Sequence, residues 1–176
     1  DVKKFFMCDH GRLKYRWMNR QDRAETPMVR ANGVLQASEW ESAIHAAAAI
    51  LKGAKVFVLA SPTLSNETLF LLSEIIEHNG GKGVFRVATG DEAPLPGVED
   101  LALRRDRAAN VNGAELLGYT RSDSPLDGLA KGDVLIVVDD DLEGLSAEKV
   151  ALASSVIVIG TTVPKSIGNP AVVLPI

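Results

Sequence analysis

The sequence is poor in cysteine and in long apolar runs. It has a single cysteine among 176 residues, so no disulfide can form within the chain, and such usage is typical of a reducing compartment. No apolar run approaches the roughly 20 residues that a helix needs to cross a bilayer. We therefore expect no direct insertion into a membrane.

The chain also lacks an excess of positive charge and the familiar nucleotide-binding motifs. Its 19 Lys and Arg residues are outnumbered by 23 Asp and Glu residues, and its net charge is −4. This balance argues against a nucleic-acid-binding protein. No predicted strand leads into a glycine-rich dinucleotide fingerprint or a P-loop, and Ser61 has no G-x-S-x-G motif around it. No catalytic residue is assigned from these patterns.

What the sequence does contain is a clear strand–loop–helix pattern at residues 55–79. Val56–Ala60 is a continuous apolar run, which favours a strand buried on both faces, as in a parallel sheet. We expect Ser65 or Asn66 to cap the following helix and Gly80 to end it. The helix has apolar residues at helical spacing, namely Leu69, Leu72, Ile75 and Ile76.

The rest of the chain predicts more elements of the same kind. A helix should begin at a capping box, Ser38 to Glu41, and run to about Lys52, with one apolar face made by Trp40, Ala43, Ile44, Ala47 and Leu51. Ser146 should cap a short helix. Further strands are expected at residues 83–87, 133–138, 156–159 and 171–174. The predicted fold is therefore α/β and Rossmann-like, with a mostly parallel sheet of four to five strands flanked by helices over residues 38–176.

Ligands of such sheets bind beyond the carboxyl ends of the strands. Four loops are expected at that edge, at residues 61–67, 88–92, 139–142 and 160–165. Asp139, Asp140 and Asp141 follow a predicted strand, and carboxylates in this place can hold Mg²⁺. Because adjacent side chains cannot all face one ion, a polar strand end followed by a turn is the commoner case. The run from Arg104 to Arg107 is expected to be solvated or salt-bridged.

Residues 1–37 are expected to form an extended basic and aromatic arm that contains Cys8. A lone cysteine is most simply a small buried apolar residue, but its neighbours extend the pattern: Cys8-x-x-Gly11-Arg12-x-x-Tyr15, then Asn19-Arg20, Asp22-Arg23, Pro27 and the capping box with Trp40. This pattern resembles the molybdopterin oxidoreductase superfamily. The resemblance implies that Cys8 is the cofactor-binding and metal-ligating residue, as the fourth ligand of a [4Fe–4S] cluster. Such a cluster takes four thiolates, so this chain alone is not expected to bind it.

Two groups within that superfamily fit the sequence. The catalytic molybdenum or tungsten enzymes often have Lys in place of His10, and carry a Cys, selenocysteine, Ser or Asp ligand in a segment matching residues 106–118. This chain has neither Cys nor selenocysteine there. Its segment Asn110-x-Asn112-Gly113-Ala114-Glu115-Leu116-Leu117-Gly118 instead resembles the large iron–sulfur subunit of NADH–quinone oxidoreductase, respiratory complex I. The resemblance implies a domain that keeps the fold without molybdopterin.

The resemblance to this large iron–sulfur subunit implies a scaffold for iron–sulfur electron transfer from NADH to quinone, with no chemistry in the chain itself. It implies that the partners are other subunits of the peripheral arm of the respiratory complex. It also implies a cytoplasmic localisation, peripheral to the bacterial inner membrane. The sequence begins without Met and ends on an apolar run, so we expect a fragment of a larger protein. One alternative is part of a catalytic molybdopterin enzyme such as formate dehydrogenase. Another is a non-redox α/β binding module in which Cys8 is structural.

Overall fold

The computed structural model describes residues 20–95, 98–102 and 104–176. Cys8 and His10, with the remainder of residues 1–19, lie outside the described residues. In chain order the helices and strands are β1 (Met28–Ala31), β2 (Val34–Ala37), α2 (Trp40–Leu51), β3 (Val56–Ala60), α3 (Asn66–His78), β4 (Lys82–Phe85), β5 (Pro94–Leu95), β6 (Val98–Ala102), α4 (Val111–Leu116), β7 (Thr120–Arg121), the 3₁₀ helix η3 (Pro125–Gly128), β8 (Val134–Val138), α5 (Ala147–Val150), β9 (Ser155–Ile159) and β10 (Val172–Leu174).

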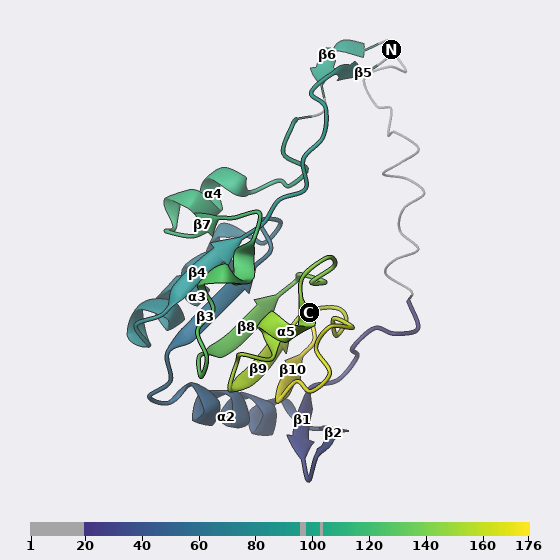
Figure 1. Ribbon diagram of the computed structural model, residues 1–176. Helices are drawn as coiled ribbons and strands as arrows, with labels where there is room; N and C mark the ends of the chain where they lie inside the picture. Colours follow the sequence, from purple (N-terminus) through teal and green to yellow (C-terminus); the bar gives the residue numbers. More distant parts are fainter. Residues whose placement is uncertain (1–19, 96–97, 103) are drawn as a thin grey trace.

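The described strands form one mixed eight-stranded sheet in the order β2-β1-β10-β9-β8-β3-β4-β7 (Figure 1). All pairs from β10 to β7 are parallel, whereas β1 runs antiparallel to both β2 and β10. The predicted α/β class is confirmed. The count of four to five strands is too low, because the antiparallel pair β1–β2 and the two-residue strand β7 extend the sheet at its two edges. Residues 28–37, which we assigned to the arm, thus pair with the sheet.

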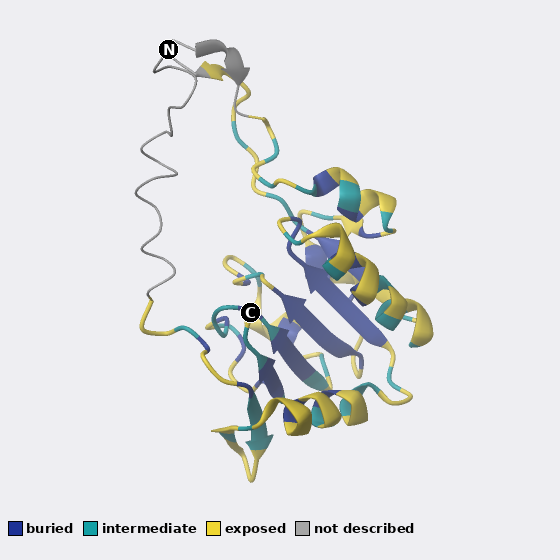
Figure 2. Ribbon diagram, turned by 180° about the vertical axis from the view of Figure 1, so that it is seen from behind, coloured by how far each residue is buried: buried dark blue, intermediate teal, exposed yellow. Residues whose placement is uncertain are grey.

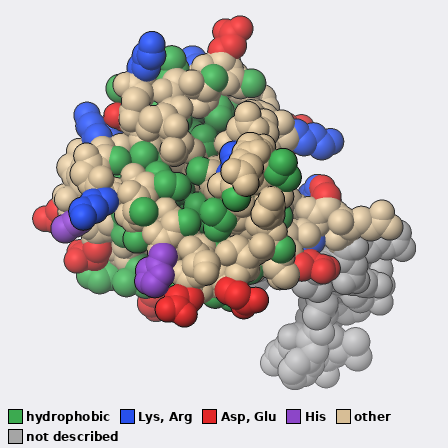
Figure 3. Space-filling model, turned by 90° about the horizontal axis from the view of Figure 1, so that it is seen from below, with side chains coloured by type: hydrophobic (Ala, Val, Ile, Leu, Met, Phe, Trp, Pro, Cys, Tyr) green, Lys and Arg blue, Asp and Glu red, His purple; other side chains and the backbone are tan. Residues whose placement is uncertain are grey.

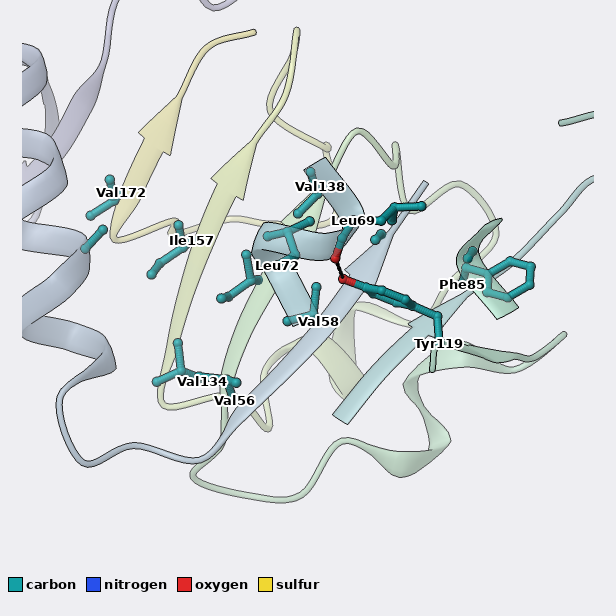
Figure 4. Close-up of a cluster of buried hydrophobic side chains, with 14 of the residues drawn as sticks. Val56, Val58, Leu69, Leu72, Phe85, Tyr119, Val134, Val138, Ile157 and Val172 are labelled. Atoms are coloured by element: carbon teal, nitrogen blue, oxygen red, sulfur yellow. Dashed lines mark hydrogen bonds between the residues drawn. The ribbon is translucent and has the colours of Figure 1, made fainter. Parts of the chain in front are cut away.

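The central strands are buried on both faces. Helices α2, α3 and α4 pack on one face of the sheet, and η3, α5 and neighbouring loops pack on the other. Figure 2 shows the buried strands in dark blue and the exposed outer sides of the helices in yellow. In β3, Val56 and Val58 pack in one core cluster with Leu69 and Leu72 of α3, as Figure 4 shows. Phe57 belongs to the cluster on the opposite face. This alternation along a fully apolar strand is the burial that a parallel sheet with two covered faces requires.

The two predicted helix starts differ in outcome. Ser65 is the N-cap of α3, and its side chain accepts a hydrogen bond from the Thr68 N–H at 3.3 Å, as expected. The capping box at Ser38 is wrong, because Glu39 occupies the N-cap position of α2 and makes no side-chain capping bond. The Ser38 N–H instead donates to the Pro27 carbonyl at 2.8 Å. This bond ties the residue before α2 to the chain at the start of β1.

The apolar face predicted for α2 is only partly buried. Ala43 and Ala47 are buried against the sheet, whereas Trp40 is 49% exposed and Ile44 is 51% exposed. The helix packs through its small alanine side chains, so the larger neighbours on the same predicted face lie outside the contact. Viewed from the end of the molecule that carries α2, hydrophobic side chains gather on the surface (Figure 3).

The remaining described strands lie outside the main sheet. The strands β5 and β6 form a separate two-stranded sheet that projects away from the domain (Figure 1). Within the described ranges, no helix has the length and apolar character needed to cross a bilayer.

Candidate functional site at the carboxyl edge of the sheet

Three of the four predicted edge loops follow the carboxyl ends of β3, β8 and β9 and meet along one edge. The Ser61 and Thr63 hydroxyls are hydrogen-bonded at 2.8 Å. The Thr63 hydroxyl in turn donates to the Asp139 carboxylate at 3.5 Å. Asp139 has a positive φ of 50°, which turns the chain sharply as it leaves β8. The loops after β3 and β8 are therefore joined by side-chain contacts, as the sheet topology predicts.

The charged centre of this edge is Arg86, which follows β4. Its guanidinium binds Asp140 through two hydrogen bonds, from Nε at 2.9 Å and from Nη2 at 2.8 Å. The same Nη2 donates to Asp141 at 2.8 Å, and Nη1 donates to the Glu143 carbonyl at 2.6 Å. Planar guanidinium groups bind carboxylates in this two-pronged way. One arginine thus pairs with two of the three aspartates that follow β8.

This arrangement changes the interpretation of the aspartate run. Burial alone would lower the pKa of Arg86, but the hydrogen bonds and charges of Asp140 and Asp141 outweigh it and raise the pKa above its ordinary value. The Asp140 carboxylate also accepts a hydrogen bond from the Leu142 N–H at 2.7 Å. Its oxygens are therefore engaged by protein donors. Among the described residues, no group of three or more His, Cys, Asp and Glu side chains is placed to hold a metal ion.

Residues 20–24, which follow the segment containing Cys8, are attached to the same edge. The Ala24 N–H donates to the Thr161 carbonyl at 2.8 Å, beyond the end of β9, and the Ala24 side chain is buried. Arg23 forms an isolated antiparallel bridge with Thr162 and donates from its guanidinium to the Ile176 carbonyl at 3.0 Å. The chain that leads back toward Cys8 is thus bound to the carboxyl edge at several points.

A second structural contact joins α4 to the loop after β3. The Asn110 side-chain amide donates to the Leu64 carbonyl at 2.8 Å and to the Asn66 side-chain oxygen at 2.9 Å. Gly113 lies against these two asparagines, with no room for a Cβ atom beside their side-chain oxygens. Asn110, in the segment that resembles the large iron–sulfur subunit, therefore ties the start of α4 to the loop after β3 and to α3.

Two hollows flank the Arg86 ion pairs. One, of about 260 Å³, lies between the loops after β8 and β9 and is lined by Arg20 and the three aspartates. The other, of about 500 Å³, brings together Ser61, Ala88 and Asp140, so the loop at 88–92 also adjoins this edge. All four predicted loops thus border the same side of the sheet.

The charge run 104–107 lies off this edge, at the base of the β5–β6 hairpin. Asp106 binds Arg121 through two hydrogen bonds, at 2.7 and 2.8 Å, and this pairing lowers the pKa of Asp106 below its ordinary value. The Arg107 guanidinium donates to the backbone carbonyls of Arg104 and Asp91. The expectation of a salt-bridged run is therefore correct for Asp106, and Arg107 braces the hairpin.

The predicted ligand Cys8 lies outside the described residues, so its role stays a prediction. Arg86 is the site residue that was not predicted from the sequence. Its sequence signal was weak: a single arginine at the end of a predicted strand, with its acidic partners 54 and 55 positions away. A run of three acids after a buried strand does, however, indicate that a positively charged partner lies nearby. Arg86 is that partner, because the parallel sheet brings the end of β4 to the same edge as the end of β8.

Comparison with known proteins gives a consistent set of relatives. The chain is 31% identical over 154 residues to the G subunit of NADH-quinone oxidoreductase of Escherichia coli strain K12. It is 29% identical over 157 residues to the protein of that name from Pseudomonas fluorescens, and 30% identical over 154 residues to that of Salmonella typhimurium. No family model matches the chain.

Each of these matches covers 86% of this chain but 15% of the relative. The chain therefore spans about 15% of the length of the curated relatives it matches. The resemblance to this subunit that was predicted from the sequence is confirmed by these relatives.

Proposed function

We propose that this chain is an α/β scaffold within the large iron–sulfur subunit, the G subunit, of an NADH–quinone oxidoreductase, and that it does no chemistry itself. The observation that carries the proposal is the similarity to G subunits over 86% of the chain. In this role the longer protein acts with the other subunits of the peripheral arm of the complex. Its place is on the cytoplasmic side, peripheral to the bacterial inner membrane.

We further propose that Cys8 is one ligand of a [4Fe–4S] cluster. The donor set of this chain does not suffice for the cluster, because it supplies one cysteine and the cluster takes four thiolates. The other three must come from elsewhere in the longer protein. When bound, the cluster supplies one-electron transfer, and the task of this chain is to hold Cys8 in position.

The attachment of residues 20–24 supports that task. The bonds of Ala24 and Arg23 fix the chain at the ends of β9 and β10. About 12 residues separate Arg20 from Cys8, and an extended chain advances at most about 3.6 Å per residue. Twelve such steps span at most about 43 Å, so this attachment sets an upper limit on how far a cluster bound by Cys8 can lie from the carboxyl edge.

Two features favour a scaffold over a catalytic molybdopterin enzyme, which is the alternative. The carboxylates of Asp140 and Asp141 are already paired within the protein, with Arg86. The segment 106–118, where the metal ligand of such an enzyme is expected, holds Asn110 and Gly113 in a packed contact with Asn66. Its polar groups thus have a structural role.

Substitution of the cysteine tests the cluster proposal. In the full-length protein, Cys8→Ser should lower the iron content by about four atoms per molecule and remove one [4Fe–4S] signal from the electron paramagnetic resonance spectrum of the reduced protein. Ser38→Ala, which alters a side chain without a capping bond, serves as the control and should leave both unchanged. Unchanged iron and an unchanged spectrum in Cys8→Ser would mean that Cys8 is structural.

A further inference from the structure

Three large apolar side chains are exposed on the neighbouring helices α3 and α4. Phe70 and Leu71 of α3 are 50% and 63% exposed, and Leu116 of α4 is 87% exposed. Single exposed apolar residues are ordinary. Three of this size on two contacting helices indicate an interaction surface. Figure 2 shows that α3 and α4 present their outer sides to solvent.

The two helices are held together firmly. Asn66, in the first turn of α3, accepts a hydrogen bond from Asn110 at the start of α4, and Gly113 lies against both asparagines. Tyr119, just after α4, donates from its buried hydroxyl to the Leu69 carbonyl at 2.9 Å (Figure 4).

The exposed side chains lie one helical turn along the sequence from the residues that make these contacts. Phe70 comes one turn after Asn66, and Leu116 comes one turn after Gly113, so the exposed side chains project from a fixed frame. A rigid surface of this kind loses little conformational freedom when it binds a partner.

The apolar residues lie among acidic ones. Glu67 and Glu74 on α3 and Glu115 on α4 are all exposed. Hydrogen bonds from its own backbone and from Ser65 lower the pKa of Glu67, so this carboxylate is ionised at neutral pH. Arg121, whose charge acts on Glu115, is itself bound to Asp106.

On α3, Glu67 and Glu74 lie three or four positions from Phe70 and Leu71 and so on the same side of the helix. On α4, Glu115 is adjacent to Leu116. Carboxylates therefore flank the exposed apolar side chains and form the negative rim of this surface.

We propose that this surface, the helical face (Phe70, Leu71 and Leu116 with Glu67, Glu74 and Glu115), docks a partner segment whose apolar side chains are flanked by Lys or Arg. Apolar anchors would cover the centre, and the basic residues would meet the carboxylates. A second copy of this chain fits less well, because a two-fold contact would bring one acidic rim against another. An anionic membrane surface is likewise repelled by the rim. This proposal is independent of the role of Cys8.

A binding measurement on the 176-residue chain tests the proposal. The probe is a fluorescent amphipathic helical peptide with leucines on one face and lysines beside them, and its counterpart has Glu in place of every Lys. The lysine peptide should bind and the glutamate peptide should not. Leu71→Gln and Leu116→Gln should each weaken binding about tenfold or more, the loss typical of a central interface residue. Glu67→Gln with Glu115→Gln should weaken it most at low salt.

The matched control is Ile44→Gln on α2, which alters another half-exposed apolar side chain and should leave the affinity within about twofold. Gln is a good helix former, so all these variants should keep the wild-type circular dichroism spectrum. The proposal is overturned if neither peptide binds, if both bind equally, or if Ile44→Gln weakens binding as much as Leu116→Gln does. Light scattering that shows a dimer which Leu116→Gln dissociates would make the occupant a second copy instead.

Discussion

Arg86 binds Asp140 through two parallel hydrogen bonds, although 54 positions separate the two residues in the sequence. The parallel sheet brings them together, because β4 and β8 lie on either side of β3 and all three end at the same edge. The Asp140 side chain is 8% exposed. The pair therefore joins two loops in a place where an isolated carboxylate would be poorly solvated.

Removal of the Arg86 guanidinium should destabilise the protein. Arg86→Met leaves Asp140 without its partner, and we expect a loss of about 2 kcal/mol in the free energy of unfolding, below the full cost of a buried pair because Arg86 is partly solvated. Arg86→Lys keeps the charge but not the two-pronged geometry and should lose about half as much. Urea denaturation measures both values.

The control for Arg86→Met is a substitution of Arg20, which forms an ion pair with Asp22. Both side chains of that pair are exposed. Arg20→Met should barely change the denaturation midpoint, since exposed ion pairs contribute little. If Arg86→Met were as harmless as Arg20→Met, the Arg86 pairs would not hold the edge together.

The packing of Gly113 leads to a second prediction. A methyl group at this position would collide with the side-chain oxygens of Asn110 and Asn66, so Gly113→Ala should lower stability by about 1–3 kcal/mol, as overpacking does. Gly168→Ala is the matched control, because its Cβ would meet no atom within 4 Å and its φ is not in the left-handed region. Thermal denaturation should show a lower midpoint only for Gly113→Ala. Equal midpoints for the two variants would contradict the packed contact between α4 and the loop after β3.

Burial of Tyr119 predicts a dependence of stability on alkaline pH. Burial raises the pKa of Tyr119 from 10.0 to about 12. A raised pKa means that the unfolded chain loses its proton first as the pH rises, so the stability that the neutral hydroxyl contributes is present below pH 10 and is lost between 10 and 12. Wild type should therefore lose stability more steeply than Tyr119→Phe over that range. Parallel curves for the two proteins would show that Tyr119 titrates normally.

The central strands could be predicted from the sequence because their signal is local. Val56–Ala60 is a strand with the predicted bounds, since a continuous apolar run suits a strand covered on both faces. The edge strands were missed for two different reasons. Met28–Ala31 forms a hairpin with Val34–Ala37 through Asn32 and Gly33, which both have positive φ, and an Asn-Gly turn is a local signal that the sequence offered. The pairing of the same strand with Val172 and Val173 joins residues more than a hundred positions apart along the chain. Nothing near Met28 in the sequence specifies that partner.

The candidate site was predictable as a place but not as a set of contacts. The four loops border one edge because parallel strands end together, which the topology alone dictates. The capture of Asp140 by Arg86 depends on the strand order, which periodicity does not reveal. The exposure of Trp40 likewise depends on how closely Ala43 and Ala47 let α2 approach the sheet.

The most direct test is elemental analysis of the full-length protein that contains this chain, for iron together with molybdenum and tungsten. We predict iron without either of the heavier metals. The polar groups of the carboxyl edge are engaged by Arg86 and Asn110, and in our proposal Cys8 is a ligand of an iron–sulfur cluster. Iron accompanied by molybdenum or tungsten would contradict this account and would make the carboxyl edge part of a catalytic cofactor cleft.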